Sequence, residues 1–222
     1  MAIETAYFSA DNKRQNSECV IFVEGVDDAY FLSKLLAEIG ADPSKNGIVE
    51  VGGKTNFSSR LRAFLKSSNF TRGVIKRLII VCDADANATA AHGSIRDTLQ
   101  NAGQPAIEQN SFATNETGIT IGIFAMPNGQ DAGDLESLCL DTVAGTELAA
   151  AADSYMQAAV DIAQSKRKVM TGSLTKRKAQ IYLAGFPDDL CRGAGRGYSI
   201  GAFDNSHVAL APLKAFLTSG IA

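Results

Sequence analysis

Two aspartates that follow a strongly apolar run are the first residues of this chain with obvious chemical potential. Asp83 and Asp85 come directly after Leu78–Cys82, whose β-branched residues predict a strand buried on both faces. Open α/β sheets bind their ligands at the carboxyl ends of such strands. Two carboxylates this close repel each other and are costly to bury, and a bound divalent cation relieves both costs. Taken alone, the pair fits equally well a solvated turn in which Asp serves the turn geometry.

A second acidic junction follows the first apolar run of the chain. Glu24 comes after Cys19–Val23 and before a helical pattern over residues 29–39. Asp27 and Asp28 stand where a capping or first-turn acid of that helix belongs. Glutamate is not a favoured cap, so Glu24 is the acid of this junction that helix capping explains least.

A third junction carries glycine and lysine instead of acid. Gly53 and Lys54 follow a short predicted strand over residues 48–51 and precede another helical pattern. This is not a P-loop, because that motif needs glycine where this chain has Ile48. A glycine turn with a lysine could still hold one phosphate. A strand-to-helix turn with a solvated lysine explains the same residues equally well.

The fourth junction places Glu136 after a glycine-rich turn, in the first turn of a predicted helix where the helix dipole alone would favour it. Parallel strands joined by helices have all their carboxyl ends at one edge of the sheet. We therefore expect Glu24, Asp83 and Asp85 to converge there. An oxygen-only set without His or Cys predicts magnesium rather than zinc.

These junctions predict an α/β protein with a mostly parallel, four-stranded, Rossmann-like sheet flanked by helices. Residues 105–116 and 186–201 show no regular pattern, so we expect loops there. The expected organisation is an N-terminal arm over residues 1–17, an α/β core over 18–143, and a mainly helical C-terminal extension over 144–222.

The composition of the chain limits the kinds of partner that it can bind. The 222 residues are 45% hydrophobic and 20% charged, with a net charge of -3, which is an ordinary globular profile and excludes a generally basic nucleic-acid binder. A dense basic segment over residues 166–178 includes Lys176 and Lys178. Such a run is either a solvated face or a contact for a phosphate backbone.

The four cysteines are widely spaced and form no CxxC pair, which predicts reduced thiols in a cytoplasmic protein. The first residues show no signal-peptide pattern, and no apolar run is long enough to span a bilayer. We therefore expect no membrane association.

Together, the motifs Val23-Glu24-Gly25-x-x-Asp28 and Asp83-x-Asp85 resemble the Toprim domain of topoisomerases, primases, recombination mediators and overcoming-lysogenization-defect (OLD) nucleases. The segment 51–56, Val-Gly-Gly-Lys-Thr-Asn, resembles the OLD branch. This resemblance covers roughly residues 18–140. The C-terminal part looks like an uncharacterised bacterial Toprim-like family that stands alone.

The resemblance implies phosphoryl transfer on DNA or RNA that depends on Mg²⁺ or Mn²⁺, most simply by a nuclease. Glu24 would act as general acid or base, or as a metal ligand, while Asp83 and Asp85 hold the ion and Glu136 helps to hold a second one. The residues expected to contact phosphate or nucleic acid are Gly25, Asp28, Gly53, Lys54, Lys176 and Lys178. The ATPase domain of OLD nucleases has no counterpart here, so an ATPase or another protein is an expected partner.

Three other functions fit parts of the pattern. A catalytically silent Toprim-fold module could bind nucleotide or nucleic acid together with a partner protein. A haloacid-dehalogenase-type phosphatase uses a similar strand-DxD motif, but it wants Thr or Val where this chain has Asn87. A DxD sugar-nucleotide transferase would need a base-binding segment that the sequence does not show.

Overall fold

The computed structural model describes residues 5–8, 16–167, 172–186 and 193–221. Its centre is a five-stranded sheet with the strand order β2-β1-β3-β5-β4. Four strands run parallel: β1 (Cys19–Val23), β2 (Asn46–Glu50), β3 (Arg77–Asp83) and β5 (Thr120–Met126). The predicted α/β class and mostly parallel sheet are therefore confirmed.

The prediction of four strands was wrong, because a fifth strand lies in the segment expected to be irregular. β4 (Phe112–Thr114) pairs antiparallel with β5 at the edge of the sheet. Three residues are too few to show the alternation by which a strand is recognised. Phe112 lies opposite Gly122, where a Cβ atom would collide with the Phe112 and Phe216 rings. Glycine at position 122 therefore permits the close packing of these two rings against the sheet.

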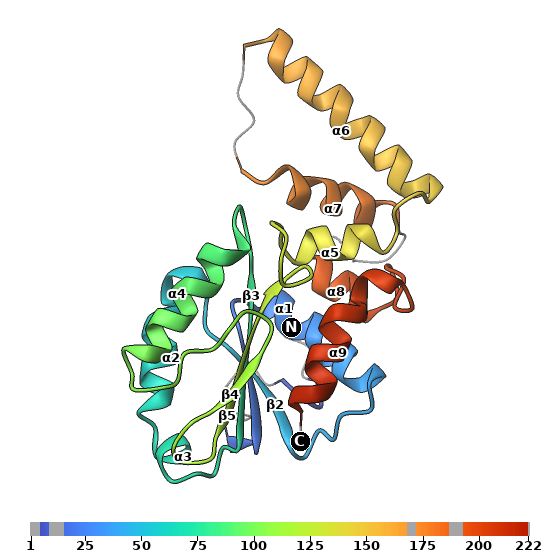
Figure 1. Cartoon of the computed structure of the whole chain (residues 1–222). Helices are drawn as coiled ribbons and strands as arrows, with labels where there is room; N and C mark the ends of the chain where they lie inside the picture. Colours follow the sequence, from blue (N-terminus) through green and yellow to red (C-terminus); the bar gives the residue numbers. More distant parts are fainter. Residues whose placement is uncertain (1–4, 9–15, 168–171, 187–192, 222) are drawn as a thin grey trace.

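Helices cover both faces of the sheet (Figure 1). Side chains of α2 (Lys54–Leu65) and α4 (Ala88–Gln100) form one core with alternate residues of the strands. The other residues of the strands form a second core with α1 (Val26–Glu38), α5 (Leu135–Asp141), α8 (Ala194–Ser199) and α9 (Ala211–Gly220). Burial on both faces explains why β1 and β3 are continuous apolar runs. Two short elements, α3 (Ser68–Thr71) and the 3₁₀ helix η2 (Val208–Leu210), complete this body.

Helix α8 lies where a loop was expected, so that prediction was wrong. It packs against α1, and a Cβ atom at Gly195 would collide with the backbone of Asp27. A Cβ atom at Gly197 would likewise press on Leu183 and Phe203. Glycine is a poor helix former, so the sequence favours a loop. This helix forms because its glycines permit close packing against its neighbours.

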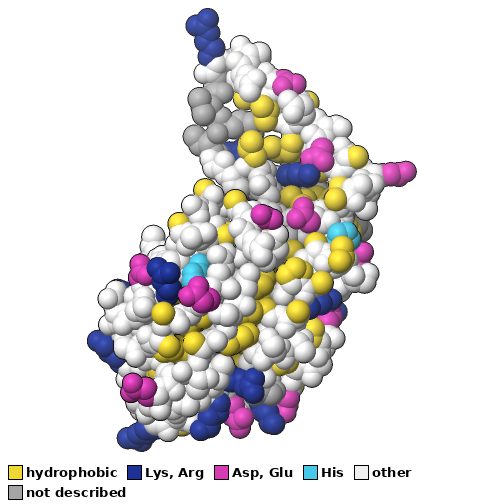
Figure 2. Space-filling view, in the orientation of Figure 1, with side chains coloured by type: hydrophobic (Ala, Val, Ile, Leu, Met, Phe, Trp, Pro, Cys, Tyr) yellow, Lys and Arg dark blue, Asp and Glu magenta, His cyan; other side chains and the backbone are white. Residues whose placement is uncertain are grey.

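Two helices extend beyond the body of the molecule (Figure 1). α6 (Glu147–Ser165) and α7 (Leu174–Ala184) pack against each other, and α7 also contacts α5 and α8. We call these two helices the α6–α7 arm. Figure 2 shows hydrophobic side chains gathered on this face over the arm, with charged side chains beside them.

Cys19, Cys82 and Cys139 are buried, free thiols, as predicted. The fourth, Cys191, lies outside the described residues. At the N-terminus Phe8 is buried and forms an isolated parallel bridge with Ile48, at the outer side of β2. Within the described ranges, no helix combines the length and apolar character needed to cross a membrane.

Candidate functional site

The candidate site lies where the chain reverses its direction of travel across the sheet. From β1 the chain passes through α1 to β2 on one side, and from β2 it returns through α2 and α3 to β3 on the other side. The carboxyl ends of β1 and β3 therefore border a crevice of the kind in which α/β proteins bind ligands. Glu24 follows β1 and Asp83 ends β3, and the Glu24 Oε1 atom accepts a 3.4 Å hydrogen bond from the Asp83 backbone N–H.

A cavity of about 470 Å³ opens at this edge. Its lining includes the four predicted carboxylates, which come from three separate strand-to-helix junctions, namely Glu24, Asp83, Asp85 and Glu136. The structure also brings to this cavity most of the residues expected to bind phosphate, which are Gly25, Asp28, Gly53, Lys54 and Lys176. Residues up to 152 positions apart in the sequence, from Glu24 to Lys176, thus line one cavity.

Asp83 is the carboxylate most affected by its surroundings. Its Oδ1 atom accepts a 3.1 Å hydrogen bond from the backbone N–H of Leu135, at the start of α5. Burial, together with the nearby charges of Asp28 and Glu24, raises the pKa of Asp83 to about 8. Near neutral pH the neutral form of Asp83 is therefore favoured over the bare carboxylate.

Asp85 is held differently, by an unusual backbone and a lysine. Its φ of 49° is in the left-handed region, which Asp tolerates better than most residues. Two 2.7 Å hydrogen bonds with Gly133 fix this backbone beside the loop that precedes α5. The carboxylate, 48% exposed, forms an ion pair with Lys54, the first residue of α2.

The turn that presents Lys54 is tied to the acidic junction after β1. Gly53 has a φ of 99°, which glycine adopts readily, and its N–H donates a 2.8 Å hydrogen bond to the carbonyl of Glu24. The Lys54 ammonium group therefore sits on a turn anchored to the site. Asp85 raises the pKa of Lys54, which keeps the ammonium charged.

Asp28 and Glu24, which lie in and just before the first turn of α1, also line the cavity. Asp28 accepts a 2.8 Å hydrogen bond from the N–H of Gly25 and so caps α1, as predicted. Burial raises the pKa of Asp28 to about 7. Burial also raises the pKa of Glu24, while the Asp83 backbone hydrogen bond and Lys54 act in the opposite direction.

Asp27 is a residue of this site whose contacts sequence reasoning missed. It was expected only to serve its own helix, but its carboxylate accepts hydrogen bonds of 3.0 Å and 3.1 Å from the N–H groups of Gly195 and Arg196. Asp27 thus holds the N-terminus of α8 against α1. Its partners are 168 and 169 positions away, so local sequence contains no signal for the contact.

Glu136 and Lys176 close the remaining side of the cavity. Glu136 lies in the first turn of α5, as predicted, and its side chain is only 14% exposed. Burial raises its pKa, and the neighbouring Lys176 lowers it. The Lys176 Nζ atom lies 3.7 Å from the Glu136 carboxylate, so the arm contributes a charge to the site.

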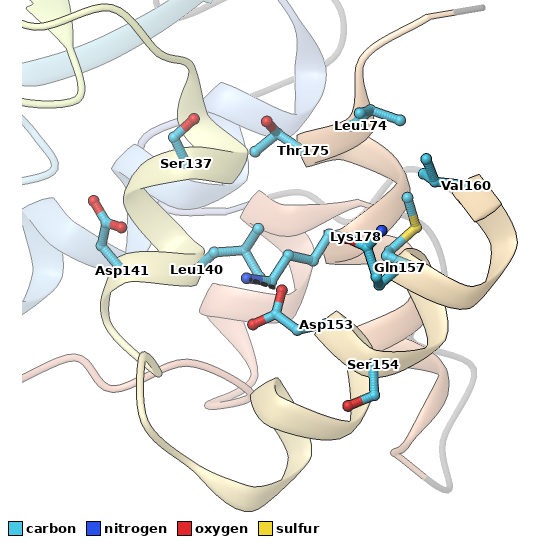
Figure 3. A pocket seen from close by; sticks show the side chains of 11 residues that line it. Ser137, Leu140, Asp141, Asp153, Ser154, Gln157, Val160, Leu174, Thr175 and Lys178 are labelled. Carbon is cyan, nitrogen blue, oxygen red and sulfur yellow. Dashed lines mark ion pairs between the residues drawn. The ribbon is translucent and has the colours of Figure 1, made fainter. Parts of the chain in front are cut away.

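The structure separates Lys178 from Lys176. Lys178 forms a 2.6 Å ion pair with Asp153 in a groove of about 780 Å³ lined by α5, α6 and α7, where it points toward α6 (Figure 3). Of the two lysines predicted to bind phosphate from the basic segment, only Lys176 lines the acidic cavity.

Within the described part of the chain, no three His, Cys, Asp or Glu side chains are grouped as ready-made metal ligands. Lys54 and Lys176 each hold one of the four predicted carboxylates, Asp85 and Glu136. The site as described is therefore a set of acids that share a cavity with two lysine counterions.

Comparison with known proteins places the chain in a family. A family model described as "Protein of unknown function (DUF3226)" matches residues 18–220, which include all five strands and every residue of the cavity. No curated protein and no solved structure matches the chain. The chain belongs to the DUF3226 family.

Proposed function

We propose that this protein is a Mg²⁺-dependent phosphoryl-transfer enzyme acting on nucleic acid, as a nuclease of the Toprim type. One observation carries the proposal. Carboxylates from three strand-to-helix junctions line one cavity at the crevice between the carboxyl ends of β1 and β3. Helix capping accounts for Asp27 and Asp28, and Asp83 also accepts the Leu135 N–H at the start of α5, but no such role explains Glu24 and Asp85.

The donor atoms fit magnesium. Glu24, Asp83, Asp85 and Glu136 offer only carboxylate oxygens, which Mg²⁺ prefers, and none of the described residues that line the cavity is His or Cys. Burial raises the pKa of Asp83, Glu24 and Glu136, so a bound cation would favour the ionised forms that burial disfavours. When bound, the ion would neutralise phosphate oxygens and lower the pKa of water.

The chain's own residues have distinct roles in this proposal. Asp83 and Asp85 would hold the ion, with Glu136 on the far wall as the additional carboxylate. Glu24, whose pKa burial raises, would accept and return a proton during the reaction. Lys54 and Lys176 would face the phosphate groups of the substrate, which are the only strongly anionic groups of a nucleic acid.

The test is cleavage of single- and double-stranded DNA and RNA with Mg²⁺ or Mn²⁺. Asp83→Asn keeps the side-chain shape and removes the charge, so we expect cleavage to fall on the order of 100-fold or more. Asp153→Asn is the matched control, because Asp153 also pairs with a lysine but lies in the groove of the arm. Equal cleavage by wild type and Asp83→Asn would refute the proposed site.

A catalytically silent binding module is the second candidate, and the two ion pairs favour it. A site whose acids are neutralised by lysines can be stable without any metal. This candidate predicts that nucleic acid raises the melting temperature of the protein while no substrate is cleaved. Metal-dependent cleavage that disappears in Asp83→Asn would eliminate it.

A further inference from the structure

Two lysines at the acidic cavity come from different parts of the chain but make the same kind of contact. Lys54 begins α2 and pairs with Asp85, which follows β3. Lys176 lies in α7 and pairs with Glu136 in the first turn of α5. Each lysine therefore neutralises a carboxylate presented by a different element of the fold.

These pairs leave two strongly buried acids of the cavity, Asp83 and Asp28, without a direct ion pair in the described part of the chain. No lysine or arginine contacts Asp83 or Asp28 among the ion pairs of the described residues. The two lysines thus pair with Asp85 and Glu136, while the buried Asp83 and Asp28 carboxyls have no such partner among the described residues.

We propose that Lys54 and Lys176 are exchangeable counterions that couple cation binding to phosphate binding. A divalent cation at Asp83 takes over Asp85 and Glu136 from the lysines, and the released ammonium groups then bind phosphate. The inference rests on the metal site of the proposed function and adds to it an order of events, in which the cation precedes the nucleic acid.

The exchange follows from charge and position. A cation and an ammonium group on the same carboxylate repel each other at short range, so the binding of one weakens the other. The Lys54 side chain is 65% exposed and the Lys176 side chain 53% exposed, so both can leave their partners without a change of fold. Both already line the cavity, so a released ammonium group remains at the place where a phosphate would bind.

Coupling of this kind is reciprocal. If the cation releases the lysines for phosphate, then phosphate that engages the lysines also frees the carboxylates for the cation. The protein would therefore bind nucleic acid weakly without metal, although its cavity holds two lysines.

The first experiment measures Mn²⁺ binding by the full chain without nucleic acid, using electron paramagnetic resonance. We expect Lys54→Met and Lys176→Met each to bind Mn²⁺ about three- to fivefold more tightly than wild type, because a competing charge has been removed. Lys178→Met is the matched control, since Lys178 lies two residues from Lys176 and pairs with Asp153 outside the cavity. It should bind Mn²⁺ as wild type does.

The second experiment measures binding of a short, phosphorothioate-protected single-stranded DNA with and without Mn²⁺. Wild type should bind this DNA at least about fivefold more tightly with the metal. The Lys54→Met/Lys176→Met double variant should lose most of that gain although it binds Mn²⁺ better. Far-ultraviolet circular dichroism verifies that each variant is folded.

The outcomes separate the two proposals. Tighter Mn²⁺ binding by the site variants alone, with loss of the DNA gain, supports the exchange. Mn²⁺ affinity that is unchanged in the site variants, or raised equally in Lys178→Met, overturns the exchange and leaves the metal site standing. Absence of Mn²⁺ binding in every protein overturns the exchange and the proposed metal-dependent activity together.

Discussion

The acidic cavity at the sheet and the groove of the α6–α7 arm offer an instructive contrast. The groove is the larger of the two, at about 780 Å³ against about 470 Å³. Both contain a lysine paired with an aspartate, Lys54 with Asp85 in the cavity and Lys178 with Asp153 in the groove. Size and the presence of an ion pair therefore do not distinguish a functional site from a surface hollow.

Connectivity and burial distinguish them. The cavity is built from the ends of β1 and β3 together with the starts of α1, α2 and α5, whereas the groove is lined by the sides of three helices. In the cavity, burial raises the pKa of Asp83 to about 8. In the groove, Asp153 is exposed, and water screens its charge. The sheet edge concentrates charge that the fold itself does not neutralise, which is the property that a ligand can exploit.

The strongest test of this contrast compares Asp83→Asn with Asp153→Asn in metal-free protein. Folded Asp83 keeps its proton up to about pH 8, whereas the unfolded carboxyl loses it near its ordinary pKa of 3.8. Because the folded state then binds more protons, the free energy of unfolding should fall as pH rises from about 4 to about 8. Asp83→Asn removes the free-energy cost of ionising a buried carboxyl group. It should therefore stabilise the protein at pH 8 by on the order of 2 kcal/mol.

Urea denaturation with a chelator present, at several pH values, measures this difference. Asp153→Asn should leave both the stability and its pH dependence nearly unchanged, because the Asp153 carboxylate is exposed. Asp83→Asn that destabilises the protein at pH 8 would contradict the view that the cavity holds unneutralised charge.

Much of the site could be predicted because its acids follow apolar runs in the sequence. Cys19–Val23 was predicted residue for residue as β1, since a strand buried on both faces is a continuous apolar segment. Glu24 and Asp83 then follow from the rule that parallel strands end at one edge of a sheet. Their convergence on one cavity needed only the order of elements along the chain.

The parts that could not be predicted depend on contacts between distant residues. The role of Asp27 requires α8, and α8 in turn requires glycines that only the packed structure explains. The different positions of Lys176 and Lys178 depend on how α7 packs against α5 and α6. No spacing within the basic segment indicates which lysine faces which helix.

A second test compares the helix caps of the two regions. Asp27→Ala removes the acceptor of two backbone N–H groups of α8, beside the cavity, and should lower the free energy of unfolding by about 1–2 kcal/mol. Ser173→Ala removes the cap of α7 in the arm, where Ser173 is exposed and accepts a 3.2 Å hydrogen bond from the Lys176 N–H. Its cost should be about 0.5–1 kcal/mol.

Chemical denaturation of both variants, followed by far-ultraviolet circular dichroism, measures the two costs. A larger loss for Ser173→Ala than for Asp27→Ala would show that the arm, rather than the wall of the cavity, limits the stability of the fold.

The test with the smallest expected effect replaces each of two nearby lysines of α7, Lys176 and Lys178, by methionine. Lys176 neutralises Glu136, whose side chain is only 14% exposed, so Lys176→Met should cost about 1 kcal/mol by leaving a buried carboxylate unpaired. Lys178 pairs with Asp153, whose side chain is 59% exposed, so Lys178→Met should change the free energy of unfolding by less than about 0.5 kcal/mol. Denaturation at low and high salt measures both, and salt should erase the smaller effect first because exposed charges are screened more strongly. Equal effects would mean that the cavity and the groove hold their charges in equally solvated surroundings, and the contrast between the two regions would then rest on connectivity alone.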